Sequence, residues 1–361
     1  MNSELVLERL LAVLPDNQTR FTELCRSVSN CNALLEQAER HGLLGILHTT
    51  LTEFGNVLPP EVATSLRRRA TLQRLRQAHD YSILDEILLE LSRAGVEAVP
   101  LKGPILSERL YGDGAVRSST DLDLLVAPNV LPSATRCLER LGYRGAQGST
   151  AGEFARYHHH LLAFHRAQSP SVELHFRLYT GFGAVLTAEG FLARARGYTT
   201  ARGLSCRVLV PEDELLFLLL HAAGHRFARL AWLYDIKMFT NVYQPLHWAA
   251  VEECARQSGV GNAVALACDI LRRRLKFPCP HAHKRSDVSE IRLHLANSLL
   301  AANRRLAPES LPDKFLSLCY QAALCDRFST MSRFLLHRCG RFARRYLPED
   351  SSNHLSEEWA A

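Results

Sequence analysis

The chain has 361 residues, of which 47% are hydrophobic and 22% are charged, and its formal net charge is +6. This composition provides a sizeable core and excludes a disordered protein, and the length predicts two or three lobes. The modest positive charge permits an anionic substrate, but it does not indicate a duplex-DNA-binding protein, in which basic residues gather on one face.

Localisation is predicted from three features of the sequence. The ten cysteines include no Cys-x-x-Cys pair, which favours free thiols in a reducing cytoplasm over disulfides or a zinc site. Glu4 and Glu8 lie where a secretory signal would be basic and apolar. The longest apolar run, Leu215–Leu220, is far shorter than the roughly 18 residues that span a bilayer. We expect a cytoplasmic protein without a membrane segment.

Residues 1–94 are predicted to form an N-terminal helical region. Apolar residues recur at helical spacing, Pro59-Pro60 interrupts the pattern, and one long helix is expected from Glu61 to Ala94. Five arginines occupy the first half of that helix, at positions 67, 68, 69, 74 and 76. We interpret them as a solvated face, and a track for an RNA acceptor is the alternative.

Residues 95–210 are predicted to form an α/β core, and residues 211–361 a C-terminal helical region. The elements expected in the core are strand Ala98–Leu101, helix Pro104–Tyr111, strand Leu122–Val126, helix Leu131–Leu141, strands near Tyr157–His165 and Ser171–Phe176, helix Thr187–Arg196 and strand Arg207–Val210. Pro211 and the acidic residues after it favour the start of the first C-terminal helix.

Two carboxylates begin the strand in the centre of this core. Asp121 and Asp123 are separated by one residue, so on a strand they project from the same face, with Leu122 and Leu124 on the other. Carboxylates held this close repel each other, and a divalent cation such as Mg²⁺ would relieve the repulsion. The alternative is a solvated strand end.

The turn upstream of this strand has the features of an anion site. Gly103 permits a close backbone approach, and Pro104 suits the first position of a helix. The N–H groups of the first helical turn, with Lys102 beside them, would bind phosphate.

The order of these motifs resembles a known family. Leu101-Lys102-Gly103, Arg117, Asp121-Leu-Asp123-Leu-Leu and Val172-Glu-Leu-His175 are similar to motifs of the polymerase-β-like nucleotidyltransferase superfamily, and most similar to bacterial proteins described as uncharacterised nucleotidyltransferases. The resemblance implies an α+β fold, in which a small mixed-sheet core is flanked by N- and C-terminal helical lobes. It also implies an enzyme that uses Mg²⁺, or Mn²⁺, to move a nucleoside monophosphate (NMP) from a nucleoside triphosphate (NTP) to an acceptor. Most members carry Gly-Ser at the phosphate turn, where this chain has Lys-Gly-Pro.

Two further residues complete the expected site. Arg117 is interpreted as a contact to phosphate or a group that orients the carboxylates, and a salt bridge to Asp121 or Asp113 is the alternative. Glu173 shares a strand face with His175 and would complete a carboxylate triad, with Glu153 as the rival. The candidate residues are therefore Asp121, Asp123 and Glu173 for catalysis and metal binding, and Lys102, Gly103 and Arg117 for nucleotide binding.

Several histidines have no assigned role. We expect one of His158, His159, His160 and His165 to line the cleft. His221 and His225 are interpreted as helix-packing residues, with base stacking or acceptor positioning as the alternative, and Asp235 as a partner for one of them.

The sequence specifies neither the acceptor, which is a small molecule, a protein or an RNA, nor the base of the NTP, nor the oligomeric state. A catalytically degenerate nucleotide- or RNA-binding module is the alternative function, and the intact pair of Asp121 and Asp123 argues against it.

Overall fold

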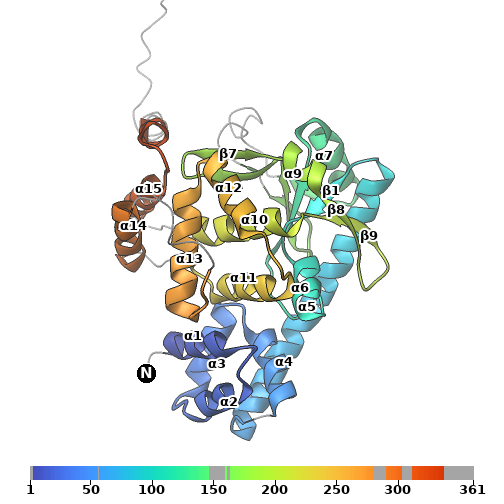
Figure 1. The fold of residues 1–361 in the computed structure, drawn as a ribbon. Coiled ribbons are helices and arrows are strands. Elements are labelled where there is room, and N and C mark those ends of the chain that lie inside the picture. Colours follow the sequence, from blue (N-terminus) through green and yellow to red (C-terminus); the bar gives the residue numbers. More distant parts are fainter. Residues whose placement is uncertain are drawn as a thin grey trace, which may run out of the picture.

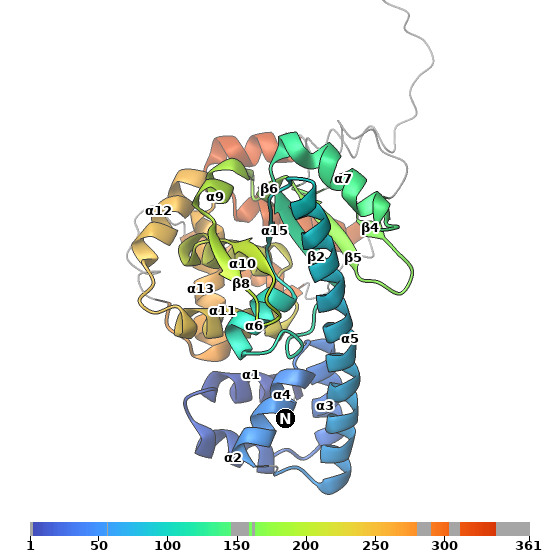
Figure 2. The ribbon, with the colours of Figure 1, turned by 90° about the vertical axis from the view of Figure 1, so that its right-hand side faces the viewer.

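The computed structural model describes residues 3–55, 57–145, 159–160, 163–279, 290–302 and 311–336. The N-terminal helices gather at one end of the molecule, and the sheet and the later helices form the remainder (Figure 1). The N-terminal helices are α1 (Ser3–Val13), α2 (Gln18–Arg26), α3 (Cys31–Arg40), α4 (Leu44–Phe54) and α5 (Pro60–Arg93). The last of these runs from the N-terminal helices along the whole side of the core (Figure 2).

The core contains a mixed five-stranded sheet in the order β1-β2-β5-β4-β3. Its elements are β1 (Ala98–Pro100), α6 (Pro104–Tyr111), β2 (Asp121–Val126), the 3₁₀ helix η1 (Pro128–Val130), α7 (Leu131–Arg140), β3 (Arg144–Gly145), β4 (Phe164–His165) and β5 (Ser171–His175). β2 pairs with β1 in antiparallel and with β5 in parallel orientation. In this register Asp121 lies opposite Ser171, and Asp123 opposite Glu173.

The two faces of the sheet differ because its strands alternate. Leu122 and Leu124 of β2, with Val172 and Leu174 of β5, belong to an apolar cluster that also contains side chains of α5 and α7. The other face carries Asp121, Asp123 and Glu173, as the alternation predicts. The helical cover of one face therefore leaves the carboxylates on the opposite face.

That opposite face is approached by the later elements, which begin with two hairpins. These elements are β6 (Arg177–Gly181), β7 (Ala184–Thr187), α9 (Glu189–Arg194), β8 (Arg196–Thr199), β9 (Ser205–Val208), α10 (Pro211–Gly224), α11 (Leu230–Val242), α12 (Trp248–Ser258), α13 (Gly261–Leu275), α14 (Glu290–Ala302) and α15 (Leu311–Ala323). The helix α10 is buried along most of its length and packs against α11, α12 and α13.

The N-terminal helices are joined to these later helices. The buried Lys237 of α11 donates to the carbonyls of Leu11 and Ala12 at 3.1 and 2.8 Å, and Arg274 of α13 pairs with Glu4 and Glu8. The two helical regions flank the sheet, so the predicted α+β architecture with helices before and after the core is confirmed. The boundaries at residues 94 and 210 stay predictions.

Two elements predicted between residues 177 and 210 are present with shifted bounds. The helix expected around Thr187–Arg196 is Glu189–Arg194, and the strand expected at Arg207–Val210 is Ser205–Val208. The hairpin β6–β7 was not predicted, and its turn contains Phe182 and Gly183, both at positive φ. Within the described residues, no helix has the length and apolar character to cross a membrane.

Candidate active site

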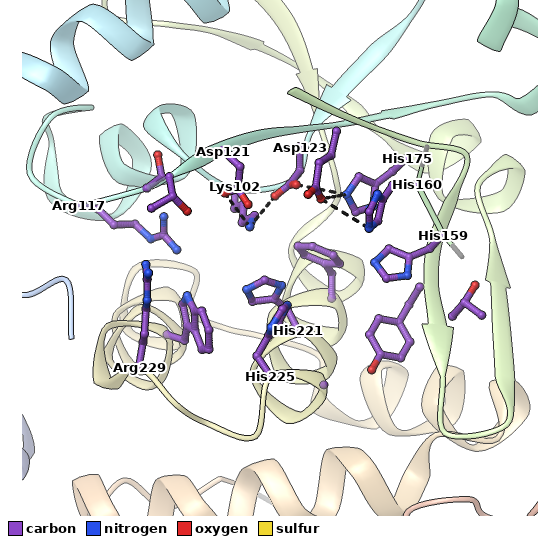
Figure 3. Close-up of a pocket in the computed structure, with 18 of the residues that line it drawn as sticks. Lys102, Arg117, Asp121, Asp123, His159, His160, His175, His221, His225 and Arg229 are labelled. Atoms are coloured by element: carbon purple, nitrogen blue, oxygen red, sulfur yellow. Dashed lines mark hydrogen bonds and ion pairs between the residues drawn. The ribbon is translucent and has the colours of Figure 1, made fainter. Parts of the chain in front are cut away.

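A cavity of about 430 Å³ lies between the carboxylate face of the sheet and the helices α10 and α11. Strands β2 and β5 supply one wall, and residues at the end of α10 and the start of α11 supply the other (Figure 3). His159 and His160 close one end, and Arg117 and Arg229 lie at the other (Figure 3). Tyr179, which also lines the cavity, stacks on His159. The cavity therefore brings together residues from widely separated parts of the chain.

Asp121 and Asp123 point into this cavity with Lys102 between them (Figure 3). The Lys102 Nζ atom lies 3.1 Å from Asp121 Oδ1 and 2.8 Å from Asp123 Oδ2. The second contact has the distance of an ion pair without the angles of a hydrogen bond, so Asp123 Oδ2 accepts no hydrogen bond from the described residues. Asp123 is only 2% exposed. A buried carboxylate oxygen that lacks a hydrogen bond is costly unless a cation lies beside it, and the Lys102 ammonium is such a cation.

Glu173 and His175 lie beside Asp123 on the next strand. The His175 Nε2 atom is 3.3 Å from Asp123 Oδ1 and 3.7 Å from Glu173 Oε2. His160 Nε2 is also 3.7 Å from Glu173 Oε2. One ligand atom from each of Asp123, Glu173 and His175 can be chosen so that all three lie within 4.8 Å of one another. These three residues therefore have the arrangement of a metal site.

The charges in this cluster keep Glu173 ionised. Burial by itself would raise the pKa of Glu173, but the neighbouring His175 and His160 imidazoles and the Lys102 ammonium outweigh burial and lower the pKa to about 2. Burial lowers the pKa of His175, so its imidazole is neutral at pH 7. A carboxylate and a neutral imidazole are the forms of these side chains that bind metal ions.

The turn before α6 positions Lys102. Gly103 has φ +79° and ψ −144°, a conformation that is available to glycine and rarely to other residues. The N–H of Leu101 donates to the carbonyl of Asp123 at 3.0 Å, which fixes the turn against β2. Lys102 lines the cavity, but Gly103 is not among the residues that line it. The contribution of Gly103 visible here is the shape of the turn, and its predicted contact with phosphate stays a prediction.

The loop between α6 and β2 is held by the long helix α5. Gln77 accepts hydrogen bonds from the N–H and the hydroxyl of Ser119, and it donates to the Ser119 carbonyl, all at 3.0 Å. Gln73 donates to the Val116 carbonyl at 3.0 Å. Four hydrogen bonds from one helix thus fix the segment that leads to Asp121.

Arg117 lines the cavity, but its partner is not one that the sequence predicted. Its Nε atom lies 2.6 Å from Asp235 Oδ2, and Tyr111 donates to the other oxygen of Asp235 at 2.7 Å. Burial disfavours the charged guanidinium, yet the Asp235 carboxylate outweighs it and raises the pKa of Arg117. A salt bridge from Arg117 to Asp121 or Asp113 and a pairing of Asp235 with a histidine are therefore wrong. Asp113 instead pairs with Arg74.

The wall opposite the carboxylates is aromatic and cationic. The rings of His221 and His225 lie 5.0 and 5.2 Å from the ring of Trp232. Arg229 lies over the same Trp232 ring at 5.8 Å, and it makes no ion pair within the described part of the chain. The Arg229 Nε atom is buried without a hydrogen-bond partner. The histidines thus face the cavity as well as pack on the helices.

Two of the remaining sequence candidates, His158 and Glu153, lie outside the described residues. His159 and His160 both line the cavity, where one histidine of this group was expected, and His165 is exposed. Sequence reasoning did not identify Arg229 or Tyr179, which carry no motif. The position of Arg229 directly before α11 was the one feature of the sequence that could have indicated its role.

A mixed sheet that presents paired carboxylates to a cavity lined with cations is the arrangement expected of a nucleotidyltransferase. A family model described as uncharacterised nucleotidyltransferase matches residues 27–276 of the 361-residue chain. The chain belongs to this family of nucleotidyltransferases, and the predicted resemblance is confirmed.

Other comparisons are distant. No curated protein matches the chain significantly. One similar solved structure is the solution structure of the antibiotic-resistance factor ANT(2'')-Ia, which is described as having substrate-regulated conformation dynamics. It is 11% identical, and the alignment covers 50% of this chain and 99% of that chain with a TM-score of 0.33.

Proposed function

We propose that the protein transfers an NMP from an NTP to an acceptor in a reaction that requires a divalent ion. The observation that carries the proposal is the convergence of three carboxylates, Asp121, Asp123 and Glu173, on one cavity that also contains cationic side chains. A nucleotide bound to a metal ion needs both kinds of group, because its phosphates are anionic and its ion is cationic. Membership of the family supports the same reaction.

Asp123, Glu173 and His175 would hold the ion, and Asp121 lies beside them. When bound, the ion supplies charge neutralisation at the phosphates. Asp123 Oδ2 accepts no hydrogen bond but lies 2.8 Å from the Lys102 ammonium, which indicates that this wall suits a cation. Lys102 already compensates part of the negative charge of Asp121 and Asp123, so it fixes both carboxylates before any ion binds.

The cationic end of the cavity suits the phosphates. Arg117 and Arg229 point toward each other from opposite walls (Figure 3). Two guanidinium groups that face each other repel, and a phosphate between them would bind both as a bidentate acceptor. Asp235 neutralises Arg117, whereas Arg229 has no such partner within the described residues. Arg229 is therefore the cation with the most to gain from an anionic ligand.

The other end of the cavity remains for the acceptor. It is formed by His159, Tyr179 and Thr180 next to Glu173, and the His159 ring stacks on the Tyr179 ring at 5.7 Å. In the proposed reaction the acceptor forms a bond to the α-phosphorus, the bond to pyrophosphate breaks, and the acceptor loses one proton. Positioning and charge neutralisation would supply most of the rate enhancement.

The test is transfer of label from an NTP labelled at the α-phosphate. The purified protein is incubated with each labelled NTP, a divalent ion and fractions of a cell extract that contain RNA, protein or small molecules. We expect one fraction to become labelled by the wild type and not by Asp123→Asn. Equal labelling by both proteins, or no labelling in any fraction, would contradict the proposal.

A non-catalytic nucleotide-binding module is the second candidate function, and one observation favours it. The Lys102 ammonium lies within 3.1 Å of both Asp121 and Asp123, close to where a cation would bind. If this ammonium replaces the ion, nucleotides should bind equally well with and without divalent ions, and no fraction should become labelled.

A further inference from the structure

The ligand set of the metal site contains a histidine. Asp123 and Glu173 offer oxygen atoms, but the third member of the cluster, His175, offers a nitrogen. Its side chain is buried, as is that of Asp123, and both project from neighbouring strands in fixed register. An ion that Asp123 and Glu173 both bind would therefore lie next to the His175 imidazole.

The distances are compatible with one ion among the three groups. Neighbouring ligands of an octahedral ion at about 2.1 Å lie about 3 Å apart. The His175 Nε2 atom is 3.3 Å from Asp123 Oδ1 and 3.7 Å from Glu173 Oε2. Side-chain rotations would be enough to bring the three atoms to one ion, because these two distances exceed the spacing of neighbouring ligands by less than about 1 Å.

The donor type determines which ion is preferred. Mg²⁺ is a hard ion that selects oxygen ligands and keeps several waters, whereas imidazole is a common ligand of divalent transition metals. His160 Nε2, at 3.7 Å from Glu173 Oε2, places a second imidazole at the edge of the same cluster. Among the described residues this cluster is thus a mixed oxygen and nitrogen site.

We propose that Asp123, Glu173 and His175 bind a divalent transition-metal ion through two carboxylates and one imidazole nitrogen, in preference to Mg²⁺. The inference deepens the proposed function, because the ion is the one that nucleotide transfer would use. His175 Nδ1 has no hydrogen-bond partner within the described residues, so no acceptor stabilises the tautomer that binds a metal through Nε2. We therefore expect a readily exchanged ion rather than a permanently bound one.

The test is electron paramagnetic resonance of Mn²⁺ added to the metal-stripped full-length protein without nucleotide. Pulsed measurements detect the nuclear spin of a directly bound nitrogen, and ¹⁵N-labelled histidine identifies that nitrogen as imidazole. We expect a ¹⁴N signal in the wild type that changes to a ¹⁵N signal after labelling. Mg²⁺ should displace Mn²⁺ only at more than about a tenfold excess.

Variants add a second measurement. His175→Asn should lose the nitrogen signal and weaken Mn²⁺ binding by about tenfold or more, since even partners of metal ligands contribute 10- to 100-fold. His225→Gln is the matched control, because His225 lines the same cavity but lies outside the cluster, and it should keep the signal. If His175→Asn does not fold, the labelled wild type decides the question alone.

Two results would overturn the inference. One is Mn²⁺ binding with no imidazole signal in the labelled wild type, and the other is displacement by Mg²⁺ on equal terms. Absence of Mn²⁺ binding counts equally against it. Because no nucleotide is present, failure here is distinct from failure of the proposed function. A nitrogen-ligated ion without label transfer would contradict only the proposed function, and label transfer with an all-oxygen site would contradict only this inference.

Discussion

Two clusters of oppositely charged side chains lie next to each other in this protein. They differ in how many of their polar atoms have hydrogen-bond partners. In the first, Arg117 and Asp235 pair at 2.6 Å, and Tyr111 occupies the second carboxylate oxygen. In the second, Lys102 lies between Asp121 and Asp123, and an oxygen of Asp123 accepts no hydrogen bond. A saturated network holds helices together, whereas an unsaturated one that faces a cavity is available to a ligand. We therefore expect the first cluster to contribute stability and the second to contribute chemistry.

The largest effect should come from the second cluster. Asp123→Asn preserves the shape of the side chain but removes the charge that would hold the ion. Loss of about 4 kcal/mol of transition-state stabilisation would lower the rate of label transfer by about a thousandfold. The melting temperature should change by only a few degrees, because Asp123 Oδ2 accepts no hydrogen bond that the substitution could remove. A variant that kept more than about a tenth of the wild-type rate would contradict the role of Asp123.

The opposite pattern is expected for the first cluster. Asp235→Asn leaves Arg117 buried without its counter-charge, and breaking such a pair costs about 3–5 kcal/mol in the free energy of unfolding. Denaturant unfolding would measure this loss. Tyr111→Phe is the matched control, because it removes one hydrogen bond from the same carboxylate and should cost about 1 kcal/mol. Equal stability of Asp235→Asn and the wild type would remove the distinction between the clusters.

Arg229 tests whether the cationic end of the cavity binds phosphate. Arg229→Gln should raise the KM for the nucleotide by about 10- to 100-fold, because a hydrogen bond to a charged group contributes about 1.5–3 kcal/mol. Arg229→Lys keeps the charge but loses the bidentate geometry of the guanidinium, so its KM should lie between those of the wild type and Arg229→Gln. Arg20→Gln removes a surface arginine paired with Glu23 and controls for net charge. An unchanged KM in Arg229→Gln would exclude this contact.

A smaller effect is expected from pH, at a histidine outside both clusters. Burial lowers the pKa of His41, whose Nδ1 accepts from the Leu230 N–H at 3.3 Å. The unfolded chain then binds the proton more tightly, so this contribution to stability is complete above about pH 6.5 and is lost as pH falls through the folded pKa. The free energy of unfolding should therefore decrease between pH 7.5 and 5, and less so in His41→Asn. An equal pH dependence of the free energy of unfolding in the wild type and His41→Asn would contradict this role of His41.

The parts of the site that could be predicted from the sequence are those set by local rules. Gly103 and Pro104 determine a turn and a helix start, and both were placed correctly because the signals lie within a few residues. The alternation around Asp121 and Asp123 fixes their common face, and the alternation around Glu173 fixes the face that it shares with His175. Whether these strands are neighbours is a matter of topology, which the family resemblance supplied.

The remaining features depend on contacts between distant residues. The partner of Arg117 is Asp235, 118 positions away, and no periodicity indicates that pairing. Arg229 lines the cavity because the segment between α10 and α11 lies opposite the carboxylate face of the sheet, an arrangement that local sequence patterns do not encode. The hairpin β6–β7, which was not predicted, places Tyr179 and Thr180 at the end of the cavity that is proposed for the acceptor.

The central claim is that a nucleotide and a divalent ion bind together at Asp123 and Glu173. The direct test is the melting temperature of the wild type and of the double variant Asp123→Asn/Glu173→Gln with ATP, GTP, CTP or UTP, each with and without Mg²⁺ or Mn²⁺. A nucleotide at about 100 times its dissociation constant should add about 2.7 kcal/mol of stability. We predict a rise that requires the ion and is lost in the double variant. No rise with any nucleotide, or an equal rise in both proteins, would contradict the claim.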